Sequence, residues 1–168
     1  LDNYGTTSKR SNQMNFLFID DKTITDELKL ILKADKTIVL ILRNSDEHSV
    51  MLHRKFIIDM FDLGITAPVI LNRFYNDISN LDFQIKSSID IGSLLIDGLG
   101  DGVWVDFGSE YGIVNQTVFG ILQASRMRIS KTEYISCPSC GRTLFDLQET
   151  TSKIREVTNH LKGVKIGI

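Results

Sequence analysis

Short apolar runs of strand length alternate along this chain with amphipathic stretches of helix length, and no other feature limits its fold as strongly. Residues 38–42, Ile-Val-Leu-Ile-Leu, are apolar at every position rather than at every second one, which is typical of a strand buried on both faces. The stretches between such runs are long enough to cross over between parallel strands. The sequence therefore predicts an α/β fold with mostly parallel strands.

Cap residues and glycines place the ends of the predicted elements. Ser45 is a candidate N-cap, and Gly64 ends the helix that follows it. Residues 73–82 are predicted to form a polar loop. The predicted strands are residues 16–19, 38–42, 68–71, 83–85, 103–105, 133–136 and 164–168. The predicted helices are residues 25–33, 45–63, 91–95, 115–126 and 142–161.

Five βα units of roughly 20–30 residues precede residue 130, which is the repeat of a (β/α) barrel. The chain is too short to close eight strands, so we expect part of a barrel, laid out as an open sheet with helices on both faces. Residues 38–42 should form a central strand, and Trp104 should belong to the core. Exposed sheet edges attract other strands, so we expect them to pair with residues 164–168 or across a homodimer.

Composition excludes several classes of function. The 168 residues are 42% hydrophobic and 24% charged, which argues against disorder. No apolar run approaches the roughly 20 residues of a membrane-spanning helix, and a net charge of −2 gives no general attraction to nucleic acid or lipid. The chain begins without a methionine or a secretory signal, and we expect it to be a piece of a longer protein.

The chain has two cysteines, Cys137 and Cys140, in the segment Cys-Pro-Ser-Cys-Gly. A secreted disulfide framework needs more cysteines at wider spacing, so a reducing compartment is the better interpretation. A turn of this kind brings both sulfur atoms to one side, and its free backbone N–H groups can donate to thiolates. The pair is therefore a candidate metal site.

Several chemistries fit a Cys-x-x-Cys pair, and local sequence leaves them open. A zinc site needs a second pair of ligands, for which His160 is the one histidine downstream. A redox-active dithiol would lie between a strand and a helix, as this pair does. An iron–sulfur cluster needs further ligands, normally cysteines. Two cysteines that only pack in the fold are the remaining interpretation.

Three segments carry a resemblance to a known family. They are EYISCPSCGRTLFDLQ at residues 133–148, LLIDGLGDGV at 94–103 and LQASRMR at 122–128. The first closely resembles the start of the iron–sulfur domain of the 4-hydroxy-3-methylbut-2-enyl diphosphate synthases, in their long, plant-like form. The resemblance implies that residues 1–131 form the C-terminal part of a barrel-like insertion domain. Residues 132–168 would then be the first βαβ unit of an α+β cluster domain.

The resemblance also implies an activity for the parent protein. Enzymes of this family reductively open 2-C-methyl-D-erythritol 2,4-cyclodiphosphate to 4-hydroxy-3-methylbut-2-enyl diphosphate, an isoprenoid precursor, with electrons from ferredoxin or flavodoxin. Their [4Fe–4S] cluster is held by three cysteines and one glutamate, and Cys137 and Cys140 match the first two cysteines. The other two ligands are expected beyond residue 168. We expect the fragment alone to be inactive, and the parent to work in the bacterial cytoplasm or the plastid stroma.

Three arginines are candidate substrate residues. Arg126 and Arg128 match an Arg-x-Arg of the family, and a cationic fork there could reach a diphosphate; the alternative is a solvated basic linker. Arg142 could act near the cluster sulfur atoms or pair with Asp146. A different class of function, a small zinc-binding α/β interaction module, is the alternative for the whole chain.

Overall fold

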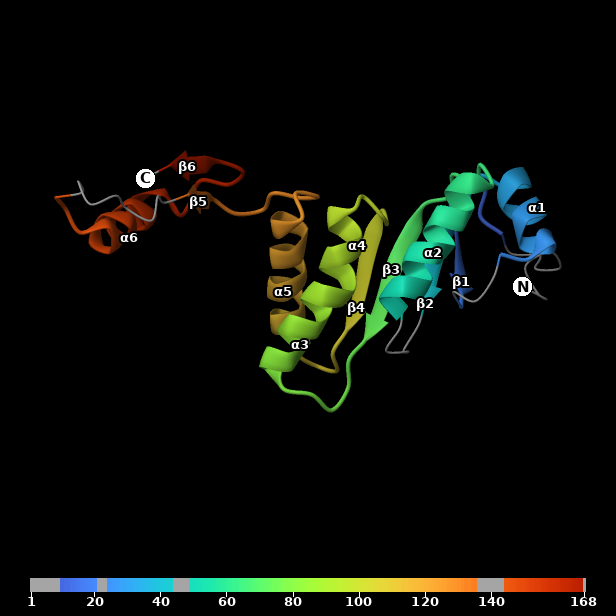
Figure 1. The fold of residues 1–168 in the computed structure, drawn as a ribbon, viewed down its shortest axis with the longest axis horizontal. Helices are drawn as coiled ribbons and strands as arrows, with labels where there is room; N and C mark the ends of the chain where they lie inside the picture. The colour runs from blue at the N-terminus through green and yellow to red at the C-terminus, as the bar shows by residue number, and fades with distance from the viewer. Residues whose placement is uncertain (1–9, 21–23, 44–48, 136–143, 168) are drawn as a thin grey trace. The chain divides into compact units, whose positions relative to one another are not determined.

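The computed structural model describes residues 10–20, 24–43, 49–135 and 144–167. The chain divides into two compact units, Leu1–Ile121 and Leu122–Ile168, which are coloured blue to orange and orange to red in Figure 1. Within these described ranges each unit has its own sheet, with four strands in the first and two in the second. The predicted α/β class is confirmed.

The first unit is a parallel sheet in which the strands follow one another in chain order, β1-β2-β3-β4. The interior strand β2 places Leu40 and Leu42 at 0% exposure, so the prediction of a central strand at 38–42 is confirmed. Strand β3 continues through Phe74, two residues into the segment that was predicted as a loop. The strands are β1 (Asn15–Ile19), β2 (Ile38–Arg43), β3 (Val69–Phe74) and β4 (Gly102–Asp106).

Helices connect these strands, and caps account for their ends. The Thr25 hydroxyl accepts a hydrogen bond from the Leu28 N–H at the start of α1. Gly64, with φ at +66°, follows α2, in a conformation that glycine adopts without strain. Ser45, the predicted N-cap of α2, lies outside the described residues. The helices are α1 (Asp26–Ala34), α2 (Ser49–Asp62), α3 (Asn80–Ser87), the π-helical turn η1 (Ser88–Gly92), α4 (Ser93–Ile96) and α5 (Tyr111–Ala124).

The predicted strand at 83–85 was wrong, because these residues belong to α3. The Ser79 hydroxyl accepts from the Asp82 N–H and donates to the Asp82 carboxylate, which makes a reciprocal helix start. Phe83 is fully buried, stacked on Phe107 at 4.3 Å and edge-on to Tyr75 at 5.4 Å. The first unit therefore contains four βα units rather than five.

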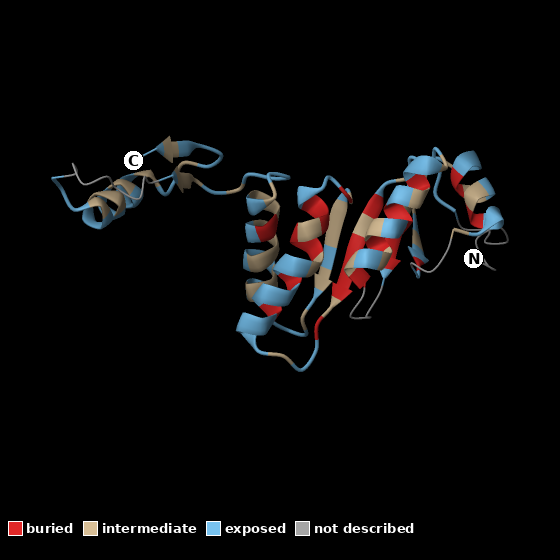
Figure 2. Cartoon of the chain, in the orientation of Figure 1, coloured by how far each residue is buried: buried red, intermediate tan, exposed pale blue. Residues whose placement is uncertain are grey.

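The prediction of helices on both faces of the sheet was also wrong. When parallel strands follow chain order, right-handed crossovers put every helix on the same face. Leu40 and Leu71 point to that covered face and are buried, as Figure 2 shows for the strands beneath the helices. Phe16 and Phe18 point to the other face and are 55% and 53% exposed.

Trp104, which we predicted to be in the core, lies on this uncovered face and is 46% exposed. Its ring centroid is 5.9 Å from that of Phe18, although β1 and β4 are the two edge strands of the sheet. Side chains from opposite edges meet only if the sheet curls toward the uncovered face. Barrels are closed from curled parallel sheets with helices outside, and the prediction from the repeat length that this unit is part of a barrel stays a prediction.

The second unit contains a small parallel βαβ motif. Strand β5 (Glu133–Ile135) pairs with β6 (Lys165–Gly167), and α6 (Leu147–Thr158) lies between them in the chain. The helix is shorter than predicted because Asp146 caps it, accepting hydrogen bonds from the Gln148 and Glu149 N–H groups. Within the described residues, β6 pairs with β5. The predicted pairing of the larger sheet's edges, with residues 164–168 or across a homodimer, stays a prediction.

No helix in the described part of the chain is both long and apolar enough to cross a membrane.

Candidate functional site

The two cysteines of the candidate metal site, Cys137 and Cys140, lie outside the described residues, as does Arg142. The structure describes the elements on either side of them. Strand β5 ends at Ile135, two residues before Cys137, and α6 begins at Leu147. The structure therefore contains a strand before the cysteine pair and a helix after it, as the sequence predicted.

The start of α6 is held by Asp146. Its carboxylate accepts hydrogen bonds from the Gln148 and Glu149 N–H groups at 2.8 Å and 2.9 Å. A carboxylate in this position also interacts favourably with the positive end of the helix dipole. Asp146, the predicted partner of Arg142, thus has a structural role of its own as a cap.

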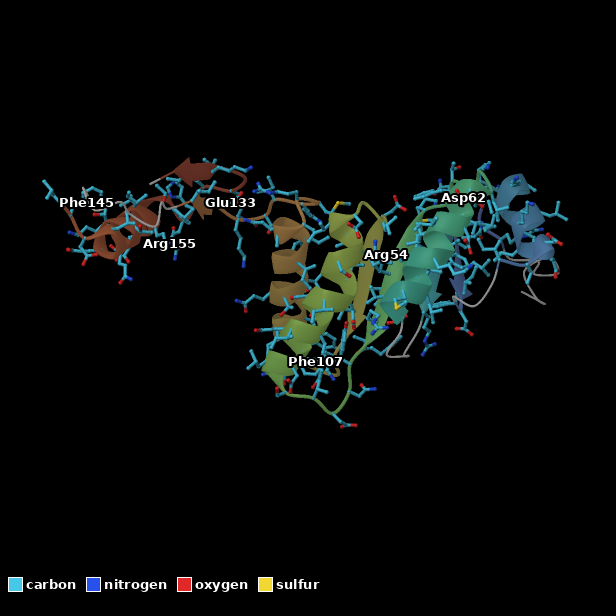
Figure 3. The ribbon with its side chains drawn as sticks, viewed as in Figure 1. Arg54, Asp62, Phe107, Glu133, Phe145 and Arg155 are labelled. Carbon is cyan, nitrogen blue, oxygen red and sulfur yellow. The ribbon has the colours of Figure 1, made fainter. Side chains whose placement is uncertain are left out.

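Polar contacts from strand β5 hold the C-terminal end of α6. The Tyr134 hydroxyl lies 2.8 Å from the Thr158 hydroxyl, and the guanidinium of Arg155 lies 5.0 Å from the centre of the Tyr134 ring. The Thr132 hydroxyl donates to the carbonyl groups of Thr158 and Leu161. Figure 3 labels Arg155 on α6 and Glu133 on the strand. The segment that leads to Cys137 is therefore tied to α6 before the cysteines begin.

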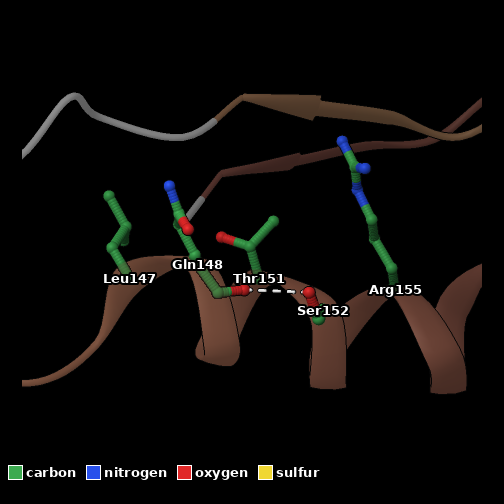
Figure 4. Close-up of a pocket in the computed structure, with 5 residues that line it drawn as sticks. All are labelled: Leu147, Gln148, Thr151, Ser152 and Arg155. Carbon is green, nitrogen blue, oxygen red and sulfur yellow. Dashed lines mark hydrogen bonds between the residues drawn. The ribbon is translucent and has the colours of Figure 1, made fainter.

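A shallow hollow of about 240 Å³ lies along α6. Figure 4 shows its lining side chains along this helix, with the Ser152 hydroxyl donating to the Gln148 carbonyl at 2.9 Å. The lining offers one cation, one amide and two hydroxyl groups beside an apolar leucine side chain, so it does not select one class of ligand. The lining residues are Leu147, Gln148, Thr151, Ser152 and Arg155.

Arg126 and Arg128 follow the C-terminal end of α5. The Arg126 Nη1 lies 3.1 Å from the Glu133 Oε2, and the Arg128 N–H donates to the Leu122 carbonyl at 3.1 Å. The side chain of Gln123 accepts from the N–H of Lys131 and donates to its carbonyl. The segment predicted as a basic linker is thus bonded to α5 and to β5. Sequence reasoning did not single out Gln123 and Glu133, although both lie in segments that carry the resemblance, because their contacts depend on the path of the chain between α5 and β5.

The zinc interpretation finds no ligand set in the described residues. His160, the one histidine downstream of the cysteines, is exposed just after α6. No group of three or more His, Cys, Asp or Glu side chains that could hold a metal ion occurs in the described part of the chain.

Sequence reasoning also missed a buried polar cluster in the first unit, because Arg73 was placed in a loop. The Arg73 guanidinium donates to the Asp90 carboxylate at 2.5 Å and to the Ser49 hydroxyl, and the Tyr75 hydroxyl donates to the same carboxylate at 2.9 Å. These residues join the end of β3 to the start of α2 and to the π-helical turn. Short π-helical turns are rare and occur mostly within α-helices, frequently at functional sites.

The pKa values of two members of this cluster, Tyr75 and Arg73, are both shifted upward. Burial raises the pKa of the Tyr75 phenol, and the charge of Asp90 raises it further. Burial lowers the pKa of Arg73, but hydrogen bonds to Asp90 and Tyr75 and the charge of Asp90 outweigh it, so the net shift is upward. An arginine that stays charged and a tyrosine that stays neutral suit a structural contact rather than proton transfer.

Comparison with known proteins identifies relatives over nearly the whole chain. The 4-hydroxy-3-methylbut-2-en-1-yl diphosphate synthase (flavodoxin) of Parabacteroides distasonis is 46% identical over 156 residues, which are 92% of this chain and 26% of that protein. The Bacteroides thetaiotaomicron protein of the same name is 43% identical over 160 residues, 94% of this chain and 26% of that protein. No protein-family model matches the chain.

A plant relative matches as well. The 4-hydroxy-3-methylbut-2-en-1-yl diphosphate synthase (ferredoxin), chloroplastic, of Oryza sativa subsp. japonica is 50% identical over 107 residues, 62% of this chain and 14% of that protein. The chain spans about a quarter of the length of the two bacterial relatives. The resemblance predicted from residues 94–103, 122–128 and 133–148 is confirmed, and the chain belongs to the family of the 4-hydroxy-3-methylbut-2-en-1-yl diphosphate synthases.

Proposed function

We propose that this chain is part of an iron–sulfur oxidoreductase of isoprenoid biosynthesis. The parent protein would reductively open 2-C-methyl-D-erythritol 2,4-cyclodiphosphate to 4-hydroxy-3-methylbut-2-enyl diphosphate. Residues 1–131 would be the end of a barrel-like insertion domain and residues 132–168 the start of the cluster domain. The observation that carries the proposal is the Cys-x-x-Cys pair between a strand and a helix, in a chain 46% identical to a synthase of that name.

The donor set of the chain fits part of a [4Fe–4S] cluster. Cys137 and Cys140 offer two thiolates, the ligand type that iron–sulfur clusters take, and they supply half of the set of three cysteines and one glutamate. When bound, such a cluster passes single electrons, and an iron with an oxygen ligand can exchange that ligand for a substrate oxygen. Of the chain's own residues, Asp146 and Tyr134 hold the two elements that flank the thiolates.

Two arginines are proposed to act toward the substrate. Arg128 follows α5 and is exposed, and Arg142 comes two residues after the second cysteine. A guanidinium group binds diphosphate oxygens in a bidentate manner and stays charged at any physiological pH. We assign Arg128 and Arg142 to the diphosphate of the substrate.

The names of the relatives support a proposal for the partners and the location of the parent protein. The bacterial relatives are named for flavodoxin and the rice protein for ferredoxin, and the latter is chloroplastic. We propose one of these two electron carriers as the donor for the parent protein, in the cytoplasm of a bacterium or the stroma of a plastid.

Metal analysis of the full-length parent tests the proposal. After anaerobic purification we expect iron and sulfide, and turnover of the cyclic diphosphate with a reduced donor. Cys137→Ser and Cys140→Ser should each lose most of the iron and all turnover, whereas the control Ser139→Ala should keep both. Stoichiometric zinc that resists exchange for iron would favour the zinc-binding module instead.

The isolated 168-residue polypeptide should not turn over the cyclic diphosphate. It offers two of the four cluster ligands, and it spans only a quarter of the length of its relatives. Anaerobic reconstitution followed by product analysis is the measurement. Turnover well above that of the Cys137→Ser variant would overturn this division of roles.

A further inference from the structure

The backbone at the end of α5 adopts a conformation that favours glycine. Arg126 has a φ of +66°, and the N–H groups of Met127 and Arg128 both donate to the Leu122 carbonyl. This is the left-handed turn that commonly ends a helix, where glycine avoids the steric strain of a side chain. The backbone conformation gives arginine no advantage over glycine at position 126. We therefore expect the side chain of Arg126 to have a role.

The side chain of Arg126 contacts the first residue of strand β5. Its Nη1 lies 3.1 Å from the Oε2 of Glu133, and the same oxygen lies 3.9 Å from the Nζ of Lys165 on β6. The backbone N–H of Glu133 donates to the Val164 carbonyl at 2.9 Å. Glu133 therefore joins the end of α5 to both strands of the small sheet.

Gln123 fixes the intervening segment from the last turn of α5. Its Oε1 accepts from the N–H groups of Ser130 and Lys131 at 3.3 Å and 3.0 Å, and its Nε2 donates to the Lys131 carbonyl at 3.3 Å. The path from α5 to β5 is thus held at both of its ends. Side-chain bonds to three backbone groups leave this segment little freedom to slide.

We infer that Arg126 is a positioning residue for the cluster domain and not a ligand of the substrate diphosphate. Its guanidinium is engaged by a carboxylate, and that carboxylate would repel a diphosphate brought to the same place. By holding Glu133, Arg126 sets the start of β5, which ends two residues before Cys137. The expected effect of Arg126 on turnover rests on the proposed function. The expected effect on the local order of β5 does not.

The exposure of Arg126 and Glu133 predicts which measurements should respond when their ion pair is broken. The Arg126 side chain is 55% exposed and that of Glu133 28% exposed, and ion pairs of this kind add little to global stability. The loss should therefore appear in the local order of β5 and in turnover, while the melting temperature changes little.

The test uses the full-length parent protein and a reciprocal set of variants. These are Arg126→Gln, Glu133→Gln, the double variant, the charge swap Arg126→Glu with Glu133→Arg, and Arg126→Gly, which suits the backbone but lacks the side chain. The matched control swaps Glu149 and Lys153, an exposed ion pair at 2.7 Å on α6. Hydrogen exchange of the β5 amides, kcat and the KM for the cyclic diphosphate are measured for each.

We expect Arg126→Gln and Glu133→Gln each to speed amide exchange in β5 at least threefold. Each should also lower kcat about three- to tenfold, with KM within twofold of the wild type. The double variant should be no worse than either single one, the charge swap should recover at least half of the loss, and Arg126→Gly should behave like Arg126→Gln. The control swap should change none of these values.

Two results would overturn the inference. A tenfold rise in KM for Arg126→Gln, with Glu133→Gln unchanged, would make Arg126 a diphosphate ligand. Wild-type exchange in Arg126→Gly would show that only the backbone turn matters. If the wild-type parent held no iron and gave no turnover, the proposed function would fail separately, and amide exchange would still decide whether Arg126 positions β5.

Discussion

The two units of this chain keep their folds in different ways. In the first unit, apolar side chains from the sheet and the helices bury one another, and Leu40, Leu42 and Phe83 are fully buried. In the described part of the second unit no residue is buried, and α6 has no buried position. The first unit is therefore held by a hydrophobic core, and the second mainly by caps, ion pairs and hydrogen bonds.

This difference indicates what each unit requires. A four-stranded sheet with a layer of helices removes enough apolar surface to offset the entropy of folding. Two strands and one helix do not, because a two-stranded sheet is marginal in water. Domains of this size usually gain stability from a metal centre or from more protein. The second unit thus has the properties of a motif that gains stability from more protein or, under the proposed function, from a metal centre.

The largest effect should come from the core of the first unit. Leu40→Ala removes a fully buried side chain from the interior strand, and we expect it to lower the free energy of unfolding by about 2–5 kcal/mol. Urea unfolding followed by the fluorescence of Trp104 measures the change. The control Leu30→Ala alters a side chain that is 70% exposed on α1 and should cost less than about 0.5 kcal/mol. Equal losses for both would show that this core is not close-packed.

A somewhat smaller effect should follow from breaking the Arg73–Asp90 pair. Asp90→Asn removes the negative charge from a pair whose side chains are 10% and 17% exposed, and Arg73 is left inside without an opposite charge from this partner. Removing one partner of a fully buried ion pair costs about 3–5 kcal/mol. Because both groups here keep some contact with water, which screens the charge left behind, we expect a smaller loss of about 2–3 kcal/mol.

The exposed pair of Arg54 and Asp97 is the control for that experiment. Its side chains are 37% and 46% exposed, and Asp97→Asn should cost less than about 1 kcal/mol. Urea unfolding of both variants gives the comparison. If Asp97→Asn cost as much as Asp90→Asn, burial would not be what gives the inner pair its importance.

Much of the first unit could be predicted from sequence because its strands are local apolar runs. Residues 38–42 show this most clearly, since an interior parallel strand is apolar on both faces. Local apolar residues also led to the wrong prediction at 83–85, because they match a short strand. Only the Ser79–Asp82 cap and the burial of Phe83 identify a helix there. Trp104 misled because the strand order of the whole sheet, which a local apolar run does not reveal, leaves the face of Trp104 without helices.

The candidate site also has a part that could be predicted from sequence and a part that could not. The cysteine pair could be found because its spacing is local and its flanking segment matches a family. The contact between Arg126 and Glu133 could not, because it depends on a left-handed turn and on the path of the chain after α5. The Arg73–Asp90 pair was missed because β3 continues three residues beyond its apolar run of 68–71, through Asn72 and Arg73 to Phe74.

Alkaline pH should weaken the first unit through Tyr75. Burial raises the pKa of this phenol, so the folded state keeps the proton at a pH where the unfolded chain has begun to lose it. The stability that this provides is complete below the unfolded pKa of about 10 and declines as the pH rises above that value. Urea unfolding at several pH values between about 9 and 11 measures how steeply the free energy of unfolding falls with pH. Tyr75→Phe should show a shallower decline, and an unchanged slope would exclude Tyr75 as its source.

The smallest effect should come from α6, and it tests the comparison most directly. Ile154 lies on the apolar side of this helix but is only half-buried, and Val157 is 69% exposed. Because little surface is removed from water at Ile154, we expect Ile154→Ala in this polypeptide to cost less than about 1 kcal/mol, and Val157→Ala even less. Hydrogen exchange of the α6 amides is the measurement, since it reports on this unit alone.

The same substitution in the full-length parent should behave differently. If further protein covers α6 there, Ile154→Ala should cost about 2–5 kcal/mol, as large-to-small changes in a closed core do, while Val157→Ala serves as the matched position on the same helix. A cost above about 2 kcal/mol already in the 168-residue polypeptide would show that the second unit has a core of its own. The contrast between a unit held by its core and a unit held by polar contacts would then be wrong.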